Sequence, residues 1–223
     1  MVEAKKAFTK LILLGDVGVG KTTLINKFAK DPKAAGVPSA TVGVDFVKKE
    51  MRIGNKDVTI QLWDTAGQEK FESIGYAFYR GVNCCMFVFD LHDKGSFGNL
   101  TKWKNNFLSQ AAPNKPDQFP FICIGNKSDL ERVVTREEAE KWCQENGGMP
   151  YFETSALNGT IVEEAFSKAA ERGLDNVDEE DIAMPTSLSS AAGAIKMDKE
   201  DHNRRGEEAT KKRKRCRDRC SVL

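Results

Sequence analysis

The stretch LILLGDVGVGKTT at residues 11–23 decides the fold, because it changes character twice within a few residues. Its apolar start, residues 11–14, predicts a buried strand, and its glycine-rich middle predicts a loop. A helix is expected to begin near Lys21. A strand, a glycine loop and a helix in direct succession place free backbone N–H groups at the helix N-terminus, where they favour an anion.

The loop fits the phosphate-binding pattern G-x-x-x-x-G-K-[ST], in which Gly15 and Gly20 precede Lys21 and Thr22. Glycines are needed because backbone N–H groups curl around phosphate oxygens, where side chains would collide. Lys21 brings a positive charge to the phosphates, and the Thr22 hydroxyl is placed for Mg²⁺. An ordinary glycine turn rarely needs the Lys-Thr pair, so we favour the phosphate site. The expected phosphate cradle is Gly15, Asp16, Val17, Gly18, Val19, Gly20, Lys21, Thr22 and Thr23.

The composition, with 40% hydrophobic and 30% charged residues, suits a soluble globular protein. The formal net charge of +1 hides an asymmetry, because residues 211–220 carry a net charge of +6 and the remainder carries −5. A mildly acidic body with a basic end indicates a local partner for the tail and argues against nucleic-acid binding. No apolar run is long enough for a transmembrane helix, so none is expected.

Apolar runs and turns predict the sheet. Residues 44–53 and 58–64 have strand character and are joined by the turn at residues 54–56, which predicts an antiparallel hairpin. Residues 83–91 form a continuous apolar run, which is typical of a central parallel strand. We therefore expect an α/β domain with a six-stranded, mostly parallel sheet, one antiparallel edge strand and helices on both faces.

Capping signals predict where helices begin. Ser96 is expected to cap a helix that runs to about residue 110, and Thr135 with Glu138 fits a capping box. A last helix is expected over residues 160–172.

Beyond that helix the apolar periodicity is lost, so the chain is interpreted as two parts. The predicted globular domain covers residues 1–174, and residues 175–223 are expected to form a flexible tail.

A second motif, DTAGQE, begins at Asp64, directly after a predicted strand. Asp64 can hold Mg²⁺ through water, the N–H of Gly67 can bind a γ-phosphate, and Gln68 can orient the attacking water. Taken alone, a plain polar loop is the better interpretation. Thr41, in an earlier loop, could place a second hydroxyl on Mg²⁺.

A third motif, NKSD at residues 126–129, indicates which base is bound. The two oxygens of Asp129 can accept from guanine N1–H and its amino group, whereas adenine would leave the carboxylate unpaired. Asn126 would join neighbouring loops, and the stem of Lys127 could cover the base. Taken alone, a helix-capping turn is about equally plausible. A fourth motif, Ser155-Ala156, could offer a backbone N–H to the guanine oxygen.

Together these motifs, in chain order and each after a strand, resemble the small GTPases over about residues 8–172. WDTAGQE, FYRG, GNKSDL and ETSA resemble the Rab family, and AFYRGVNCC, FPFICIGNKSDL and PYFETSA resemble its late-endosomal Rab seven group most. The resemblance implies a switch that binds GTP or GDP with Mg²⁺, hydrolyses GTP slowly and regulates vesicular traffic. It implies an exchange factor, a GTPase-activating protein, a GDP-dissociation inhibitor, and a prenyltransferase with its escort protein.

The resemblance also assigns single positions. Phe46, Trp63 and Phe78 match the aromatic triad that effectors of this family read. Leu157 stands where the family usually has Lys, so its contact with the base would be apolar. Val17 occupies a position dominated by small residues, where its stiff side chain would crowd the attacking water.

The tail ends in Cys220-Ser221-Val222-Leu223, which fits a C-a-a-X prenylation box whose final Leu favours geranylgeranyl. One lipid chain anchors weakly, and the adjacent basic run supplies a second signal for an anionic membrane surface. By resemblance, the expected location is the cytoplasmic face of late endosomes or lysosomes, in exchange with the cytosol.

The sequence leaves two other functions open. One is a nucleotide-dependent effector-binding module with negligible hydrolysis, against which Gln68 argues and which Val17 leaves open. The other is a P-loop kinase or ATPase, which Asp129 disfavours.

Overall fold

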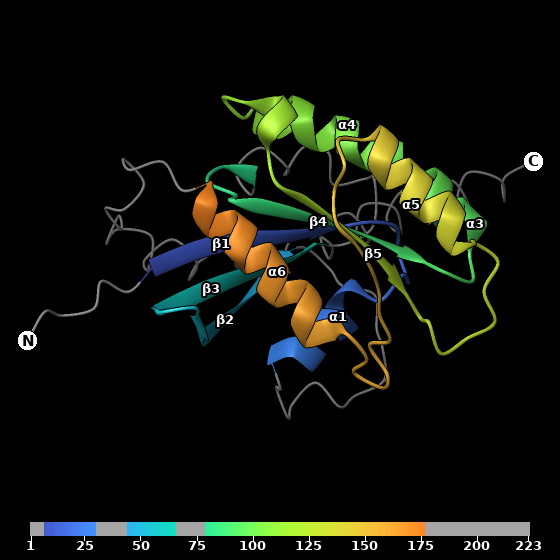
Figure 1. Cartoon of the computed structure of the whole chain (residues 1–223), viewed down its shortest axis with the longest axis horizontal. Coiled ribbons are helices and arrows are strands. Elements are labelled where there is room, and N and C mark those ends of the chain that lie inside the picture. Colours follow the sequence, from blue (N-terminus) through green and yellow to red (C-terminus); the bar gives the residue numbers. More distant parts are fainter. Residues whose placement is uncertain (1–6, 30–43, 66–78, 177–223) are drawn as a thin grey trace, which may run out of the picture. The chain divides into compact units, whose positions relative to one another are not determined.

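The computed structural model describes residues 7–29, 44–65 and 79–176, and six strands in these ranges form one sheet (Figure 1). Their order across the sheet is β2-β3-β1-β4-β5-β6. All neighbours are parallel except β2 and β3. The strands are β1 (Ala7–Leu14), β2 (Val44–Ile53), β3 (Lys56–Thr65), β4 (Cys84–Asp90), β5 (Phe121–Asn126) and β6 (Tyr151–Glu153). The predicted mostly parallel sheet with an antiparallel edge strand is confirmed.

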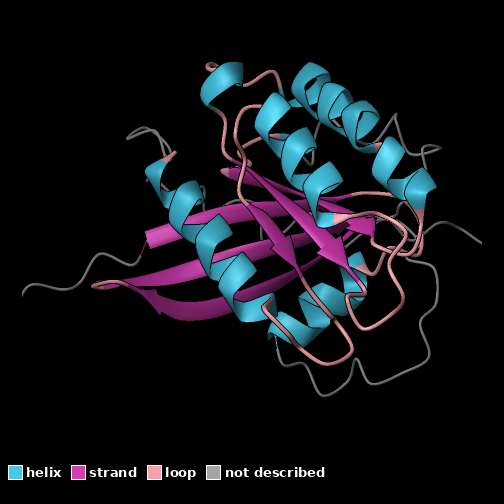
Figure 2. Cartoon of the chain, turned by 45° about the vertical axis from the view of Figure 1, so that its right-hand side comes forward, coloured by secondary structure: helices cyan, strands magenta, loops and turns pink. Residues whose placement is uncertain are grey.

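Helices cover both faces of the sheet, as predicted (Figure 2). Helices α1 and α6 pack on one face, and α3, α4 and α5 lie on the other. The helices are α1 (Lys21–Ala29), α3 (Lys94–Gly98), α4 (Leu100–Ala111), α5 (Arg136–Glu145) and α6 (Val162–Asp175), with a short 3₁₀ helix at Pro116–Gln118.

The central strand β1 shows why its sequence is apolar without alternation. Leu11 and Leu13 belong to the core under α1 and α6, whereas Ile12 and Leu14 belong to the core under α4 and α5. All four side chains are essentially inaccessible to solvent. Successive side chains of a strand point to opposite faces, so a strand covered on both sides must be apolar at every position.

Several local predictions are confirmed. The hairpin pairs Val44 with Thr65 and Ile53 with Lys56 around the predicted turn. The Thr135 hydroxyl accepts from the Glu138 N–H, and the Glu138 carboxylate accepts from the Thr135 N–H, which is the predicted capping box.

The prediction that Ser96 caps a helix is wrong. The N-cap of α3 is Asp93, whose carboxylate accepts from the N–H groups of Gly95 and Ser96. Ser96 lies inside α3, where its buried hydroxyl donates to the Asp93 carbonyl and accepts from the Asp90 N–H. The expected single helix is two helices that meet at Asn99. The Ser96 hydroxyl thus binds the end of β4, while the two oxygens of Asp93 bind the helix.

The last predicted helix corresponds to α6, which ends at Asp175. The predicted tail lies, apart from residues 175 and 176, outside the described residues.

Helices α1 and α6 meet through Phe28 and Phe166, whose rings stack with centroids 4.4 Å apart. Both side chains are buried. We expect Phe166→Ala to lower the free energy of unfolding by about 3–5 kcal/mol, because it removes a buried ring and leaves a cavity. Urea denaturation followed by circular dichroism measures this.

The control is Phe46→Ala, at a partly exposed site on an edge strand. Its cost should be well below that of Phe166→Ala. Equal losses for the two variants would show that the Phe28–Phe166 contact does not hold the helices together.

Candidate functional site

The loops that follow β1 and β5 and the segment after β6 are joined by one side chain, Asn126. Its Nδ2 donates to the Val19 carbonyl at 2.8 Å, and its Oδ1 accepts from the Ala156 N–H at 3.1 Å and the Thr154 hydroxyl at 3.2 Å. Asn126 is buried at the end of β5. The carboxyl ends of parallel strands meet at one edge of the sheet, where α/β proteins bind ligands.

Glycines let the loop after β1 approach its neighbours closely. A Cβ at Gly15 would lie 2.0 Å from the Val88 carbonyl oxygen, and one at Gly20 would lie 2.4 Å from Asn126 Nδ2. Both glycines have positive φ angles. Other residues would therefore be strained and would also displace the loop from β4 or from Asn126.

Lys21 begins α1 and reaches back over the loop. Its Nζ donates to the carbonyls of Gly15 and Asp16, both at 2.8 Å, and its side chain is buried. Burial lowers the pKa of Lys21 to about 8, while the negative charges of Asp64 and Asp16 act in the opposite direction. A buried ammonium beside free N–H groups at a helix N-terminus is suited to phosphate.

Thr22 and Asp64, two of the predicted metal ligands, lie together in the structure. The Thr22 hydroxyl donates to Asp64 Oδ2 at 2.5 Å, which joins the first turn of α1 to the end of β3. The Thr65 hydroxyl donates to the Leu13 carbonyl and ties the same strand end to β1. A hydroxyl beside a carboxylate offers oxygen ligands of the kind that Mg²⁺ prefers, so these two residues fit that ion.

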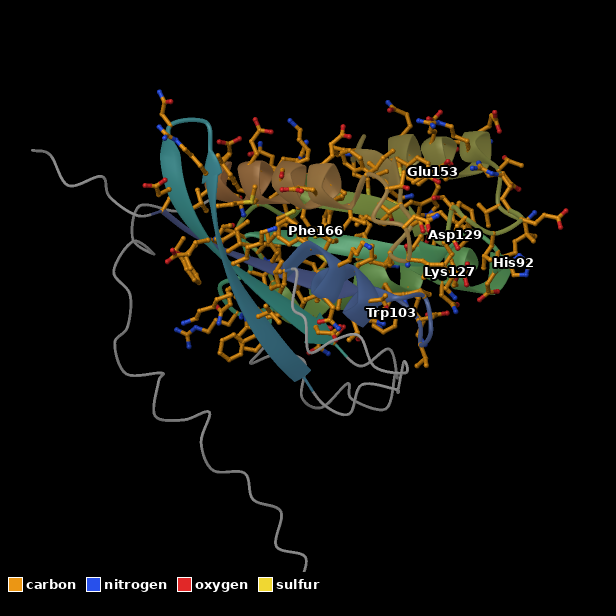
Figure 3. The ribbon with its side chains drawn as sticks, turned by 90° about the horizontal axis from the view of Figure 1, so that it is seen from below. His92, Trp103, Lys127, Asp129, Glu153 and Phe166 are labelled. Carbon is orange, nitrogen blue, oxygen red and sulfur yellow. The ribbon has the colours of Figure 1, made fainter. Side chains whose placement is uncertain are left out.

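The NKSD loop lies at the other end of the site. Asp129 is exposed, and its Oδ1 accepts from the Ser155 hydroxyl at 2.5 Å. The Ser128 N–H donates to the Thr154 carbonyl at 3.0 Å. Lys127 has a positive φ of 64°, and its ammonium lies 2.6 Å from Asp90 Oδ2. Figure 3 shows Lys127 and Asp129 at this end of the molecule.

Leu157 follows Ala156 and is 73% exposed to solvent. Its backbone carbonyl accepts from the ammonium of Lys27, on the first helix, at 3.0 Å. A Cβ at Gly159 would lie 2.6 Å from Lys27 Cε, so glycine makes room for this side chain.

On the edge hairpin, Phe46 and Trp63 are directly opposed, and their rings stack with centroids 5.5 Å apart. Phe46 is 39% exposed. The Nζ of Lys10 lies 4.2 Å from the Trp63 ring centroid.

The structure thus brings three groups of predicted residues together. The phosphate loop is bonded to Asn126, Thr22 is bonded to Asp64, and Asp129 is bonded to Ser155. Val17 is about half exposed at the loop tip, and Thr23 is exposed. The remaining predicted residues lie outside the described ranges, namely Thr41, Gly67, Gln68, Phe78 and Cys220.

Several contacts at this site were not predicted from the sequence. Asp90 binds Lys127, Lys27 binds the Leu157 carbonyl, and Trp103 and Asn99 donate to the carboxylate of Asp16. Trp103 was recognisable only as an apolar helix residue, and no local pattern connects it to a loop 87 positions away.

A strand, a Gly-Lys-Thr loop and a helix, with an Asn-x-x-Asp loop bound to them through Asn126, define a P-loop nucleotide-binding protein. The family model described as Ras family matches residues 10–175. The Ras-related protein Rab7 of Cenchrus ciliaris is 44% identical over 197 residues, which cover 86% of this chain and 95% of the relative. The Ypt/Rab-type GTPase ypt7 of Schizosaccharomyces pombe is 48% identical over 191 residues, which cover 82% of this chain and 90% of the relative.

The Ras-related protein RABG3c of Arabidopsis thaliana is 45% identical over 195 residues, with 86% of this chain and 94% of the relative covered. The chain therefore belongs to the Ras family of small GTPases, within its Rab branch and similar to the Rab7 proteins. It is a GTP-hydrolysing switch that regulates membrane traffic. In the part of the chain that the structure describes, no helix combines the length and apolar character that a membrane span requires.

The lowered pKa of Lys21 predicts that nucleotide affinity depends on pH. A bound phosphate favours the charged amine, so binding raises the pKa of Lys21 above its free value of about 8. As the pH rises through about 8, binding should therefore take up protons, and the dissociation constant should increase by up to about tenfold per pH unit. Below about pH 7 the Lys21 amine should contribute little to the pH dependence of nucleotide binding.

Calorimetry of GDP binding in two buffers of different ionisation enthalpy measures the proton uptake. Proton uptake should be clear at about pH 8.5 and nearly absent at about pH 7. Lys21→Arg is the control, because a guanidinium stays charged at both values, so its binding should take up no proton at this position. Equal proton uptake by the wild type at both pH values would contradict the assignment of Lys21.

Proposed function

We propose that the chain binds GTP and GDP through the described loops, hydrolyses GTP slowly, and acts as a lipid-anchored switch on late-endosomal or vacuolar membranes. The observation that carries this proposal is the side chain of Asn126, which bonds the phosphate loop through the Val19 carbonyl and the segment after β6 through the Ala156 N–H. Phosphate and base would therefore be bound by parts of one connected unit.

Guanine recognition falls to Asp129. The Ser155 hydroxyl holds one carboxylate oxygen, and a carboxylate retains further lone pairs for the N1–H and the amino group of guanine. The Ala156 N–H donates to Asn126, so it would share its proton with a guanine oxygen. Lys127 and Leu157 would contact the faces of the base.

At the phosphate end, Lys21 and the N–H groups of residues 15–23 would bind the phosphates. Thr22, Asp64 and Thr41 would hold Mg²⁺, which neutralises charge on the phosphates when bound. The N–H of Gly67 would bind the γ-phosphate, and Gln68 would orient the attacking water.

The proposed effector surface, tail and location are supported by the family and by the partly exposed ring pair of Phe46 and Trp63. Phe46 and Trp63 would present the effector surface together with Phe78, and residues 175–223 would form the flexible tail that joins the domain to the membrane. Relatives named Rab7 and ypt7 support an endosomal or vacuolar location. The expected partners are an exchange factor, a GTPase-activating protein, a GDP-dissociation inhibitor and a prenyltransferase with its escort protein.

We expect Asp129→Asn to change the base preference from guanine to xanthine. Xanthine offers a carbonyl where guanine has its amino group, and the Asn amide can donate to that oxygen whereas a carboxylate cannot. Competition of GDP, xanthosine diphosphate and ADP for the site measures the preference. A built-in polar pair discriminates by about 10⁴–10⁵ in favourable sites, so a change of several hundredfold is expected.

The matched control is Asp117→Asn, which makes the same chemical change at an exposed position in the 3₁₀ helix. It should leave the preference for guanine intact. Wild-type protein that takes ADP as readily as GDP would refute the guanine assignment.

For the membrane anchor we expect Cys220→Ser to move the protein into the soluble fraction of cells. A basic run alone is weak at physiological salt, where the Debye length is about 8 Å. Membrane flotation with immunoblotting measures the distribution. Ser221→Ala is the control, because it leaves the C-a-a-X cysteine in place. A Cys220→Ser protein that still floats with membranes would show that another anchor dominates.

A further inference from the structure

The phosphate loop contains a carboxylate, Asp16, that two uncharged donors bind. The indole N–H of Trp103 donates to Oδ1 at 2.7 Å, and the side-chain amide of Asn99 donates to Oδ2 at 2.7 Å. Asn99 is the residue between α3 and α4, and Trp103 lies in the first turn of α4. Both oxygens of the carboxylate are therefore directed to the helix layer on one face of the sheet.

The main chain of the same residue lies beside Lys21. The Asp16 carbonyl accepts from Lys21 Nζ at 2.8 Å, so the position of this carbonyl affects where the ammonium sits. One residue thus connects the proposed phosphate-binding lysine to α4, through its backbone on one side and its carboxylate on the other.

The two donors are themselves held in place. Trp103 packs against the core that includes Leu100 and Phe107, both fully buried on α4. Backbone bonds join Asn99 to Gly95 and Trp103 to Asn99, which fixes the junction of the two helices. The phosphate loop is therefore bonded to a well-packed helix layer.

The charge of Asp16 gives these bonds a further role. A carboxylate turned toward bound phosphates would repel them, whereas the bonds from Asn99 and Trp103 direct it toward the helix layer. Hydrogen bonds to charged groups are stronger than those between neutral groups.

We propose that Asp16, Asn99 and Trp103 form a clamp that positions the phosphate loop and slows the release of bound nucleotide. The clamp rests on the proposed nucleotide site. Pre-organising a loop in its binding conformation increases affinity because less ordering is needed on binding, and such gains are found mostly in the dissociation rate. Trp103 and Asn99 are positioning residues, which act through Asp16.

The test is the dissociation rate of fluorescent GDP from the full-length chain, measured by chase with excess unlabelled GDP. Trp103→Phe keeps a large ring in the core and removes the donor, and it should speed dissociation by about tenfold. Asn99→Ala changes an exposed position and should speed GDP dissociation severalfold. This variant tests the clamp even if Trp103→Phe does not fold.

The matched control is Trp142→Phe. Trp142 lies on α5, and its indole N–H donates to the Thr101 hydroxyl at 3.1 Å, in the same helix layer. Among the residues that the structure describes, no hydrogen bond joins Trp142 to Asp16. This variant loses a similar bond and should release GDP at the wild-type rate.

Two further readouts distinguish a clamp from general loosening of the fold. The preference for GDP over ADP should be unchanged in Trp103→Phe, because Asp129 is held by Ser155, and the segment after β6 is held by Asn126. In a double-mutant cycle, Trp103→Phe should have little additional effect once Asp16→Ala has removed the acceptor.

Wild-type dissociation rates in both Trp103→Phe and Asn99→Ala would overturn the clamp, as would independent, multiplicative effects of Asp16→Ala and Trp103→Phe. A wild-type chain that binds no GDP would instead refute the proposed nucleotide site, so failure of the clamp and failure of the function are distinguishable.

Discussion

The amide of Asn126 is the interaction on which the arrangement of the site depends. Its nitrogen binds the loop after β1 and its oxygen binds the segment after β6, so one buried side chain holds three strand ends together. An apolar residue here would leave the Val19 carbonyl and the Ala156 N–H without these bonds, at a cost of about 1–3 kcal/mol for each buried group. The glycine at position 20 follows from this, because any Cβ would occupy the place of the amide.

The packed strands and helices next to the site hold its loops in this arrangement. Strand β1 is buried on both faces, so its end cannot move without disturbing both cores. Helix α1 is packed through Phe28, and α4 is packed through Leu100 and Phe107. The described loops after β1, β5 and β6 therefore run between well-packed elements, so both partners of each contact between these loops are held in place.

The sequence predicted those parts of the fold that neighbouring residues determine. The run at residues 11–14, the hairpin turn and the capping box at Thr135 are local patterns, and each was interpreted correctly. The Ser96 cap was wrong because Asp93 binds the same helix end and Ser96 binds β4 instead. The contacts from Trp103 to Asp16 and from Lys27 to Leu157 are tertiary, and each residue alone has an ordinary role in a helix.

Helix α1 bears one group of the site at each end. Lys21 reaches the phosphate loop and Lys27 reaches the Leu157 carbonyl, and six residues of helix place them about 9 Å apart along the axis. The distance between the two halves of the site is consequently set by helix α1 and not by the conformations of several loops. At the proposed site, the length of a ligand would therefore matter as well as its chemistry, because a molecule with its charged end and its ring at another spacing would not satisfy both halves at once.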